Sequence, residues 1–202
     1  MKLRPLFAIC GMALGLAGCM PAAPQVELSL LTSLIITDVT VEASGVNDGD
    51  SELDVIKASG RDPSLPESGE YLQTDEGRKR LNERVSAMIR TEFRRVAEER
   101  LKGGVKARLV VKVNRFDVPS AIRRILAGGN PTAVAVVTLV EQSTGRVIVT
   151  SPELRGFVPA GQGVIQVAVE SMAMASQMAR PANIRVSEAM AKAYFDWLLQ
   201  NR

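Results

Sequence analysis

The sequence has no histidine and only two cysteines, Cys10 and Cys19, among its 202 residues. Without an imidazole, Ser-His-Asp and Cys-His catalysis and the usual zinc sites are excluded. Aromatic residues make up only 4% of the chain, which argues against a stacking platform for sugars. Carboxylate pairs such as Asp38 with Glu42 occur, but nothing fixes them at a glycosidase separation. We therefore expect a protein that is not an enzyme, with no catalytic residue, no metal ligand and no cofactor.

A strong excess of charge of one sign is also missing. The chain has 25 Lys and Arg against 22 Asp and Glu, a formal net charge of +3. Two of the basic residues, Lys2 and Arg4, lie at the N-terminus, and losing them would leave 23 basic and 22 acidic residues. A nearly balanced charge gives no argument for a nucleic-acid partner.

The N-terminus has the pattern of a secretory signal peptide. Lys2 and Arg4 precede an apolar run from Leu6 to Leu16, which is shorter than the roughly 20 residues that a transmembrane helix needs. The run ends in Leu16-Ala17-Gly18-Cys19, which resembles the lipobox of bacterial lipoproteins. That resemblance implies cleavage before Cys19, a diacylglyceryl thioether on its sulfur and an acyl group on its new amine. The alternative is an ordinary signal peptide followed by a chance cysteine.

Three segments follow from this interpretation: residues 1–18 as signal peptide, residues 19–26 as lipidated cysteine and tether, and residues 27–202 as one domain. A mature chain of this length suffices for a single domain with its own core. The residue after the cysteine is Met20 and not the Asp that commonly marks inner-membrane retention. By resemblance, we expect a lipid-anchored protein on the periplasmic face of the outer membrane.

The hydrophobic patterns predict an α+β fold, with a single small antiparallel or mixed sheet packed by one long helix and C-terminal helices. Expected strands are Ile36–Glu42, Ala107–Phe116, Ala133–Gln142 and Arg146–Ser151, and expected helices are Thr74–Leu101, Val164–Met178 and Asn183–Gln200. Thr74 is the expected N-cap of the long helix, and Gly103-Gly104 its end.

Residues 45–73, rich in Gly, Ser, Asp and Pro, predict a long solvated loop. Its acidic residues superficially resemble a calcium loop. The spacing fails because Leu53 stands where the turn glycine is needed. We therefore expect a solvated acidic loop and no metal site.

The long helix is expected to have two different faces. One face carries apolar residues at three- and four-residue spacing, namely Leu81, Val85, Met88, Ile89, Phe93 and Val96. Glu92 falls in the same sector, so we expect it either to extend to the edge or to meet an arginine. Arg80, Arg84, Arg94 and Arg95 lie on the opposite face and are candidate contacts for an anionic surface. The alternative is a solvated face with internal ion pairs.

The connection between the expected strands 107–116 and 133–142 is longer than a hairpin requires. It combines aliphatic and basic residues, and Ile122, Arg123, Arg124, Ile125 and Leu126 are its candidate partner contacts. Together with the following alternating strand and the Ser143-Thr144-Gly145 turn, it resembles an uncharacterised family of small bacterial envelope lipoproteins. The expected topology is also similar to lipopolysaccharide-assembly lipoproteins and to lipoprotein activators of cell-wall synthases, which are non-enzymatic partner-binding modules.

These resemblances imply a membrane-anchored accessory or assembly factor that binds another component of the cell envelope, through the 122–126 segment and the sheet edge. The alternative is a lipoprotein that holds a lipid or a glycan in a cavity between the sheet and the helices. A sizeable apolar cavity there would favour the alternative, and a filled core would oppose it.

The lipid anchor gives the first testable prediction. Mass spectrometry of the native N-terminus should find Cys19 as the first residue, carrying a diacylglyceryl group and an N-acyl chain. The protein should stay with the membranes when cells are opened, because several acyl chains together hold a protein firmly on a bilayer. An unmodified thiol, or free release, would contradict the lipoprotein interpretation.

Overall fold

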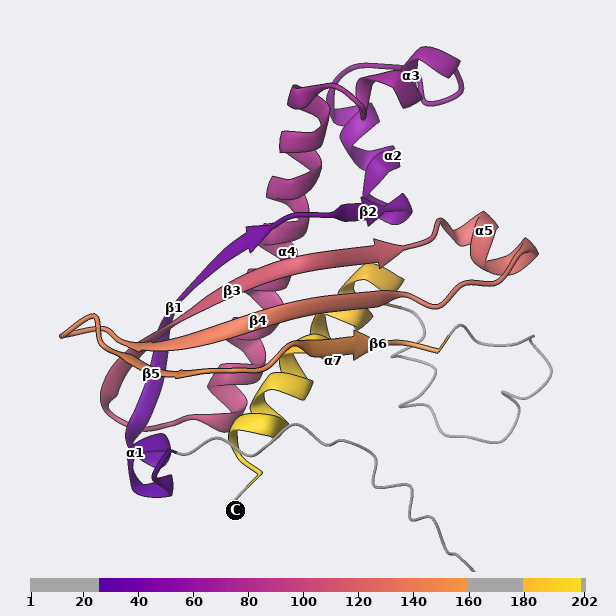
Figure 1. Cartoon of the computed structure of the whole chain (residues 1–202). Helices are drawn as coiled ribbons and strands as arrows, with labels where there is room; N and C mark the ends of the chain where they lie inside the picture. The colour runs from indigo at the N-terminus through magenta and orange to yellow at the C-terminus, as the bar shows by residue number, and fades with distance from the viewer. Residues whose placement is uncertain (1–25, 160–179, 201–202) are drawn as a thin grey trace, which may run out of the picture.

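The structure, a computed structural model, describes residues 26–159 and 180–200 (Figure 1). The expected signal peptide, Cys19 and the expected helix 164–178 lie outside the described residues. The elements follow one another as α1 (Leu28–Ser33), β1 (Leu34–Ala43), β2 (Val46–Asp48), α2 (Gly49–Ala58), α3 (Pro66–Tyr71), α4 (Asp75–Arg100), β3 (Val105–Val118), α5 (Ala121–Leu126), β4 (Thr132–Glu141), β5 (Val147–Thr150), β6 (Leu154–Phe157) and α7 (Ala182–Leu198). The α+β prediction is confirmed, with one mixed sheet, a long helix and a C-terminal helix.

The sheet of the described residues has six strands. β3 and β4 form its centre, and each of the two outer positions is occupied by two strands, one after the other. β1 and β2 lie one after the other along β3, and both run parallel to it. β4 runs antiparallel on the other side of β3, and β5 and β6 both pair with β4. A parallel pair needs a long crossover connection, which α2, α3 and α4 supply between β1 and β3.

The two faces of the sheet have different surroundings. Figure 1 shows α4 and α7 on the same side of the sheet. Along β3, Leu109 and Val111 are fully buried on that side, whereas Arg108 and Lys112 are exposed. The alternation expected for this strand is therefore confirmed. The opposite face carries half-buried valines such as Val110 between the charged residues.

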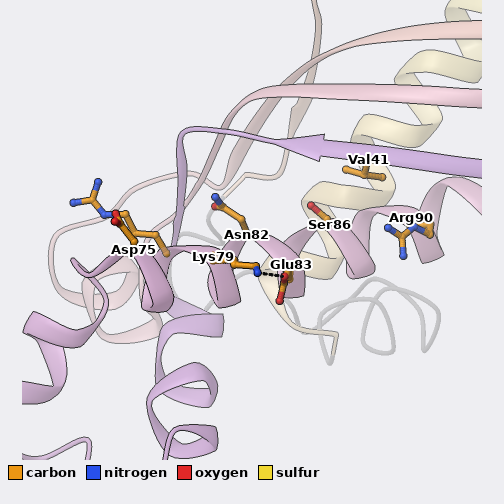
Figure 2. Close-up of a pocket in the computed structure, with 8 residues that line it drawn as sticks. Val41, Asp75, Lys79, Asn82, Glu83, Ser86 and Arg90 are labelled. Atoms are coloured by element: carbon orange, nitrogen blue, oxygen red, sulfur yellow. Dashed lines mark ion pairs between the residues drawn. The ribbon is translucent and has the colours of Figure 1, made fainter.

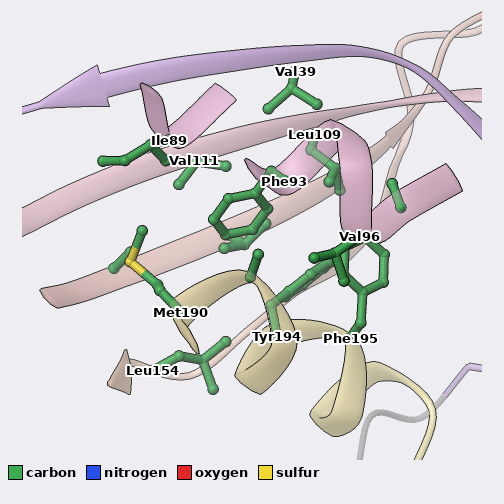
Figure 3. Close-up of a cluster of buried hydrophobic side chains, with 14 of the residues drawn as sticks. Val39, Ile89, Phe93, Val96, Leu109, Val111, Leu154, Met190, Tyr194 and Phe195 are labelled. Carbon is green, nitrogen blue, oxygen red and sulfur yellow. The ribbon is translucent and has the colours of Figure 1, made fainter. Parts of the chain in front are cut away.

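The core fills the space between the sheet and the two helices (Figure 3). Five of the six residues expected on the apolar face of α4 are buried, and Met88 is half-buried. Phe93 of α4 lies 6.2 Å, centroid to centroid, from Tyr194 of α7, and Tyr194 lies 5.0 Å from Phe195. Aromatic pairs at such distances add to the stabilisation from apolar burial. These side chains occupy the space in which the lipid- or glycan-binding alternative places its cavity.

The limits of α4 agree with the local signals. The Thr74 hydroxyl accepts a hydrogen bond from the Gly77 N–H at 3.1 Å, as an N-cap should, and Asp75 and Glu76 occupy the first turn. After the helix ends, the Gly103 N–H donates to the Leu34 carbonyl at 2.8 Å. A Cβ at Gly103 would overlap the backbone of Ser33, so the close approach requires glycine there.

The prediction of a long loop over residues 45–73 is wrong, because this segment forms β2, α2 and α3. Asp48 is the N-cap of α2 and accepts from the Asp50 N–H at 3.1 Å. Asp50 and Glu52 stand in the first turn, where the helix dipole favours negative charge. The acidic residues that look like a solvated loop are therefore the start of a helix. The short strand β6 is also additional to the predicted set.

Glu92 pairs with two arginines, which is the second of the two outcomes expected for it from the sequence. It is only 5% exposed, and it accepts from Arg180 Nη2 at 2.6 Å and from Arg95 Nε at 3.1 Å. Arg180 also donates to Glu188 of α7 at 2.6 Å. Burial opposes ionisation of Glu188, but Lys192, Arg95 and Arg180 together lower its pKa. Charged hydrogen bonds thus join α4 to α7 beside the apolar core.

Substitution of Phe93 by Ala tests the core. The ring is fully buried between the sheet and α7, and its loss should reduce the free energy of unfolding by about 3–5 kcal/mol. Urea denaturation of both proteins measures the difference. Arg94→Ala on the exposed side of the same helix is the control and should change stability by less than about 0.5 kcal/mol. Equal effects of the two substitutions would contradict the packing described here.

Candidate functional site

The segment expected to contact a partner forms a short helix, α5, at the end of the sheet where β3 leads into β4 (Figure 1). The Ser120 hydroxyl accepts a hydrogen bond from the Arg123 N–H at 3.4 Å and so caps the helix. After α5 the chain turns back through Gly128 and Gly129, whose φ angles are +72° and +123°. Both angles lie in the region that side chains rarely adopt, which explains two consecutive glycines.

The five candidate contact residues have different environments. Leu126 is 80% exposed, the most exposed large apolar side chain of the described residues, and Arg123 is exposed as well. Arg124 instead folds back on Asp50 of α2, with Nη1 and Nη2 at 3.2 and 3.1 Å from the two carboxylate oxygens. It also donates to the Pro119 carbonyl. Arg124 is therefore used by the fold itself, and its contact with a partner stays a prediction. The side chains of Ile122 and Ile125 lie outside what the structure describes.

The Arg124–Asp50 pair fixes the base of α5 on α2. The two side chains are only 19% and 16% exposed, so solvent screens their attraction less than that of a surface pair. Gly49 adds a close approach, because a Cβ there would lie within 2.8 Å of the Ser120 backbone. The tip of α5 is thus presented from a rigid base.

A buried polar network lies next to this base. Asn183 of α7 donates from its side-chain amide to Asp48 at 3.0 Å and to Ser51 at 3.2 Å. Asp48 is fully buried, and burial raises the pKa of its carboxyl although these hydrogen bonds oppose the shift. The network connects the start of α2 with the start of α7.

One hollow beside α5 is a pocket of about 850 Å³, which we name the apolar pocket. Its apolar lining includes Leu53 of α2, Ala87 and Met88 of α4, Ala121 of α5 and Ile184 of α7. The Asp50–Arg124 and Asp54–Arg84 ion pairs line it too. Mostly apolar walls with a few polar groups are typical of small-molecule sites, and the volume lies in their usual range.

A second hollow beside α5 has a volume of about 700 Å³, and we name it the polar cleft. Charged and aromatic side chains in its wall are Arg115, Asp117, Arg123, Arg155 and Phe157. Asp117 is already paired, since it accepts from Arg115 at 2.9 Å and from Asn47 at 2.9 Å. No carboxylate of the described ranges lies within ion-pair distance of Arg123. Arg155 lies 4.0 Å from Glu153, and both are well exposed. The cleft therefore has an excess of positive charge.

A third hollow follows the outer edge of β1 (Figure 2). It has a volume of about 550 Å³, and all of its lining residues except Val41 lie on or at the start of α4. Figure 2 shows the Lys79–Glu83 ion pair, with an N–O distance of 4.0 Å. Arg90 donates to the Val39 carbonyl at 3.1 Å and so covers one backbone group of the open strand edge. This groove is a shallow polar surface whose hydrogen-bonding groups are partly used by the fold.

The arginines expected to contact an anionic surface do not form one free cationic patch. Arg80 pairs with Glu76 at 2.8 Å, and Arg84 pairs with Asp54. Arg95 lies between Glu92 at 3.1 Å and Glu99 at 2.7 Å. Among residues 26–159 and 180–200, no carboxylate lies within ion-pair distance of Arg94. Three of the four arginines thus form ion pairs within the chain, and contact with an anionic surface stays a prediction for all four.

Neither a metal centre nor a membrane span is found in the part of the chain that the structure describes. Within residues 26–159 and 180–200, no group of three or more Cys, Asp or Glu side chains is placed to hold a metal ion. No helix in the same ranges is both long and apolar enough to cross a membrane.

The polar cleft and the pairing of Arg124 with Asp50 are features that the sequence did not predict. Arg155 and Phe157 lie on β6, which was not predicted, and Arg115 was seen only as part of a strand. The alternation of Leu154 and Gly156, both buried, with Arg155 and Phe157, both exposed, was the available signal for this strand. Nothing local connects Asp50 with Arg124, 74 positions apart.

No family model and no curated protein matches the chain. Among solved structures, the chain is similar to a PelC dodecamer from Paraburkholderia phytofirmans, with 8% sequence identity and a TM-score of 0.36. The similarity covers 80% of this chain and 85% of that chain. At this identity and score it gives no basis for an argument about function.

Substitution of Asp48 by Asn tests the buried network through pH. Because burial raises the pKa of Asp48, the folded state binds its proton more tightly than the unfolded state does, and stability falls as pH rises from about 4 through the folded pKa. The Asn variant lacks this loss. Glu52 adds to the same trend, since its pKa is raised by burial and then by the charge of Asp48.

We expect the Asn variant to be less stable at about pH 4, because two amide NH₂ groups would then face each other at Asn183. The difference in free energy of unfolding between the native protein and the Asn variant should narrow, or change sign, as pH rises toward neutral. Denaturant unfolding of both proteins at a series of pH values measures it. A difference that is constant or grows with pH would show that Asp48 is not a buried acid of this kind.

Proposed function

We propose that this protein is a bacterial lipoprotein, held on the periplasmic face of the outer membrane by lipid on Cys19. The support is the order of positive residues, apolar run, small residues and cysteine that ends in Leu16-Ala17-Gly18-Cys19. Several acyl chains on one residue give stable attachment, whereas a single chain does not. In this proposal the α+β domain works beside the bilayer.

The domain itself acts as a non-enzymatic accessory or assembly factor that binds another cell-envelope protein through α5. One structural observation carries this part: a helix on a fixed base presents Leu126, 80% exposed, with Arg123 beside it. Apolar side chains flanked by arginine are favourable interface residues, and a rigid base lowers the entropy lost on binding. The edge of β1, which among the strands of the described residues pairs only with β3, is the second expected contact.

The alternative is a lipoprotein that binds a lipid or a glycan. The space between the sheet and its two helices is filled by the core, which opposes the cavity that this alternative places there. The apolar pocket beside α5 is the observation that favours it, because its walls and its volume suit an apolar ligand. A lipid ligand would accordingly bind among α2, α4, α5 and α7.

The double substitution Arg123→Asp and Leu126→Asp tests the partner contact. Both side chains are exposed, so the melting temperature should not change, whereas co-purification of crosslinked envelope proteins with the full-length protein should fall by about tenfold or more. Quantitative mass spectrometry of the crosslinked complexes measures the loss.

The matched control is Leu65→Asp with Arg94→Asp, which makes the same chemical change at two exposed positions away from α5. It should leave co-purification unchanged. If the α5 variant retains its crosslinked proteins, or if the control loses them equally, α5 is not the contact.

A further inference from the structure

The polar cleft has more positive charge than its fold requires. Three arginines and one aspartate lie in its wall, and the aspartate is already satisfied by Arg115 and Asn47. Arg123 and Arg155 are exposed and come from two different elements, α5 and β6. Neither holds the domain together in the way that Arg124 or Arg180 does. Two guanidinium groups of one cleft are thus available to a ligand.

An arginine fork matches a carboxylate or phosphate group, with two parallel N–H···O bonds. The ligand chemistry of the cleft is therefore anionic. Because the whole chain is nearly balanced in charge, this preference is local to the cleft and is not the extended basic stripe of a nucleic-acid site.

One aromatic side chain completes the wall. Phe157 is 53% exposed at the end of β6, although the chain has few aromatic residues and buries Phe93, Phe116 and Phe195 completely. An exposed ring gives a flat apolar surface on which the C–H face of a sugar packs. Gly128 and Gly129 also line the cleft, and because they have no side chains they leave room for a bulky ring.

Hydrogen-bonding groups line the same space. Thr132 adds a hydroxyl, Asn47 an amide, and the paired carboxylate of Asp117 can accept further bonds from hydroxyl groups. An acidic peptide would use the arginines but would need apolar pockets for its anchoring side chains. The polar cleft has few apolar walls, whereas the neighbouring apolar pocket has many.

We infer that the polar cleft binds an anionic saccharide, whose carboxylate or phosphate group pairs with Arg123 and Arg155 and whose ring lies on Phe157. The inference does not depend on the lipid anchor or on a protein partner. It gives Arg123 a second role beside the proposed partner contact, whereas Leu126 takes part in the partner contact alone.

Titration calorimetry on the full-length protein in detergent tests this inference. The probes are trigalacturonate for the carboxylate, glucose 1-phosphate for the phosphate, and maltotriose as an uncharged saccharide. We expect one or both anionic probes to bind and maltotriose to bind at least about tenfold more weakly, a difference of about 1.4 kcal/mol. Binding should weaken as salt is raised.

Variants locate the site. Arg123→Glu with Arg155→Glu should weaken binding of the anionic probe by more than about tenfold, because charge-assisted hydrogen bonds are replaced by repulsion. Phe157→Ala should weaken binding of the anionic saccharide but leave binding of inorganic phosphate unchanged. Lys57→Glu with Lys102→Glu, the same total change of charge at two exposed positions outside the cleft, should have no effect. Leu126→Asp should also have no effect, which separates this inference from the proposed partner contact.

The inference is overturned if neither anionic probe binds, if maltotriose binds equally well, or if Lys57→Glu with Lys102→Glu weakens binding as much as the arginine double variant. Binding of hexaglutamate in place of the saccharides, lost in the double variant, would likewise overturn it and would identify an acidic-peptide site. Loss of saccharide binding in Leu126→Asp alone would place the ligand at the tip of α5 and contradict the cleft.

Discussion

The packing of two helices against one face of the sheet is the constraint on which the rest of the structure depends. Phe93 of α4 and Tyr194 of α7 meet over buried residues of β3 and β4, and apolar burial of this extent supplies most of the stabilisation. α4 is also the return path that makes β1 and β3 parallel. With one face and the core used in this way, the chain's exposed chemistry lies on the other sheet face and at the strand ends.

The position of α5 follows from contacts outside that core. Asp50 and Gly49 hold its base on α2, and Asn183 ties the cap of α2 to α7. One side of α5 therefore borders an apolar pocket, and the other borders a polar cleft with an excess of arginine. The proposed recognition role rests on this short helix with its fixed base, its exposed leucine and its two chemically different hollows.

Much of the fold could be predicted from local signals, because its strands alternate and Thr74 has the residues of a capped helix around it. The helices in residues 45–73 could not, since their composition resembles a loop and Asp48 is stabilised by Asn183, 135 positions away. The 122–126 segment stands out in the sequence and lies beside both hollows, but the pairing of Arg124 with Asp50 could not be predicted. Asp50 is brought next to Arg124 only by folding. The same holds for Arg155 and Phe157, which folding brings into one cleft with Arg123.

The most direct test of the account places a photocrosslinking amino acid at position 126 in the full-length protein and irradiates intact cells. The same residue at position 65, also exposed but remote from α5, serves as the reference. The account predicts that position 126 crosslinks to one defined envelope protein in the membrane fraction and that position 65 does not. Equal crosslinking from both positions would contradict the proposed contact through α5. So would the absence of any crosslink from position 126 when the protein is in the membrane fraction.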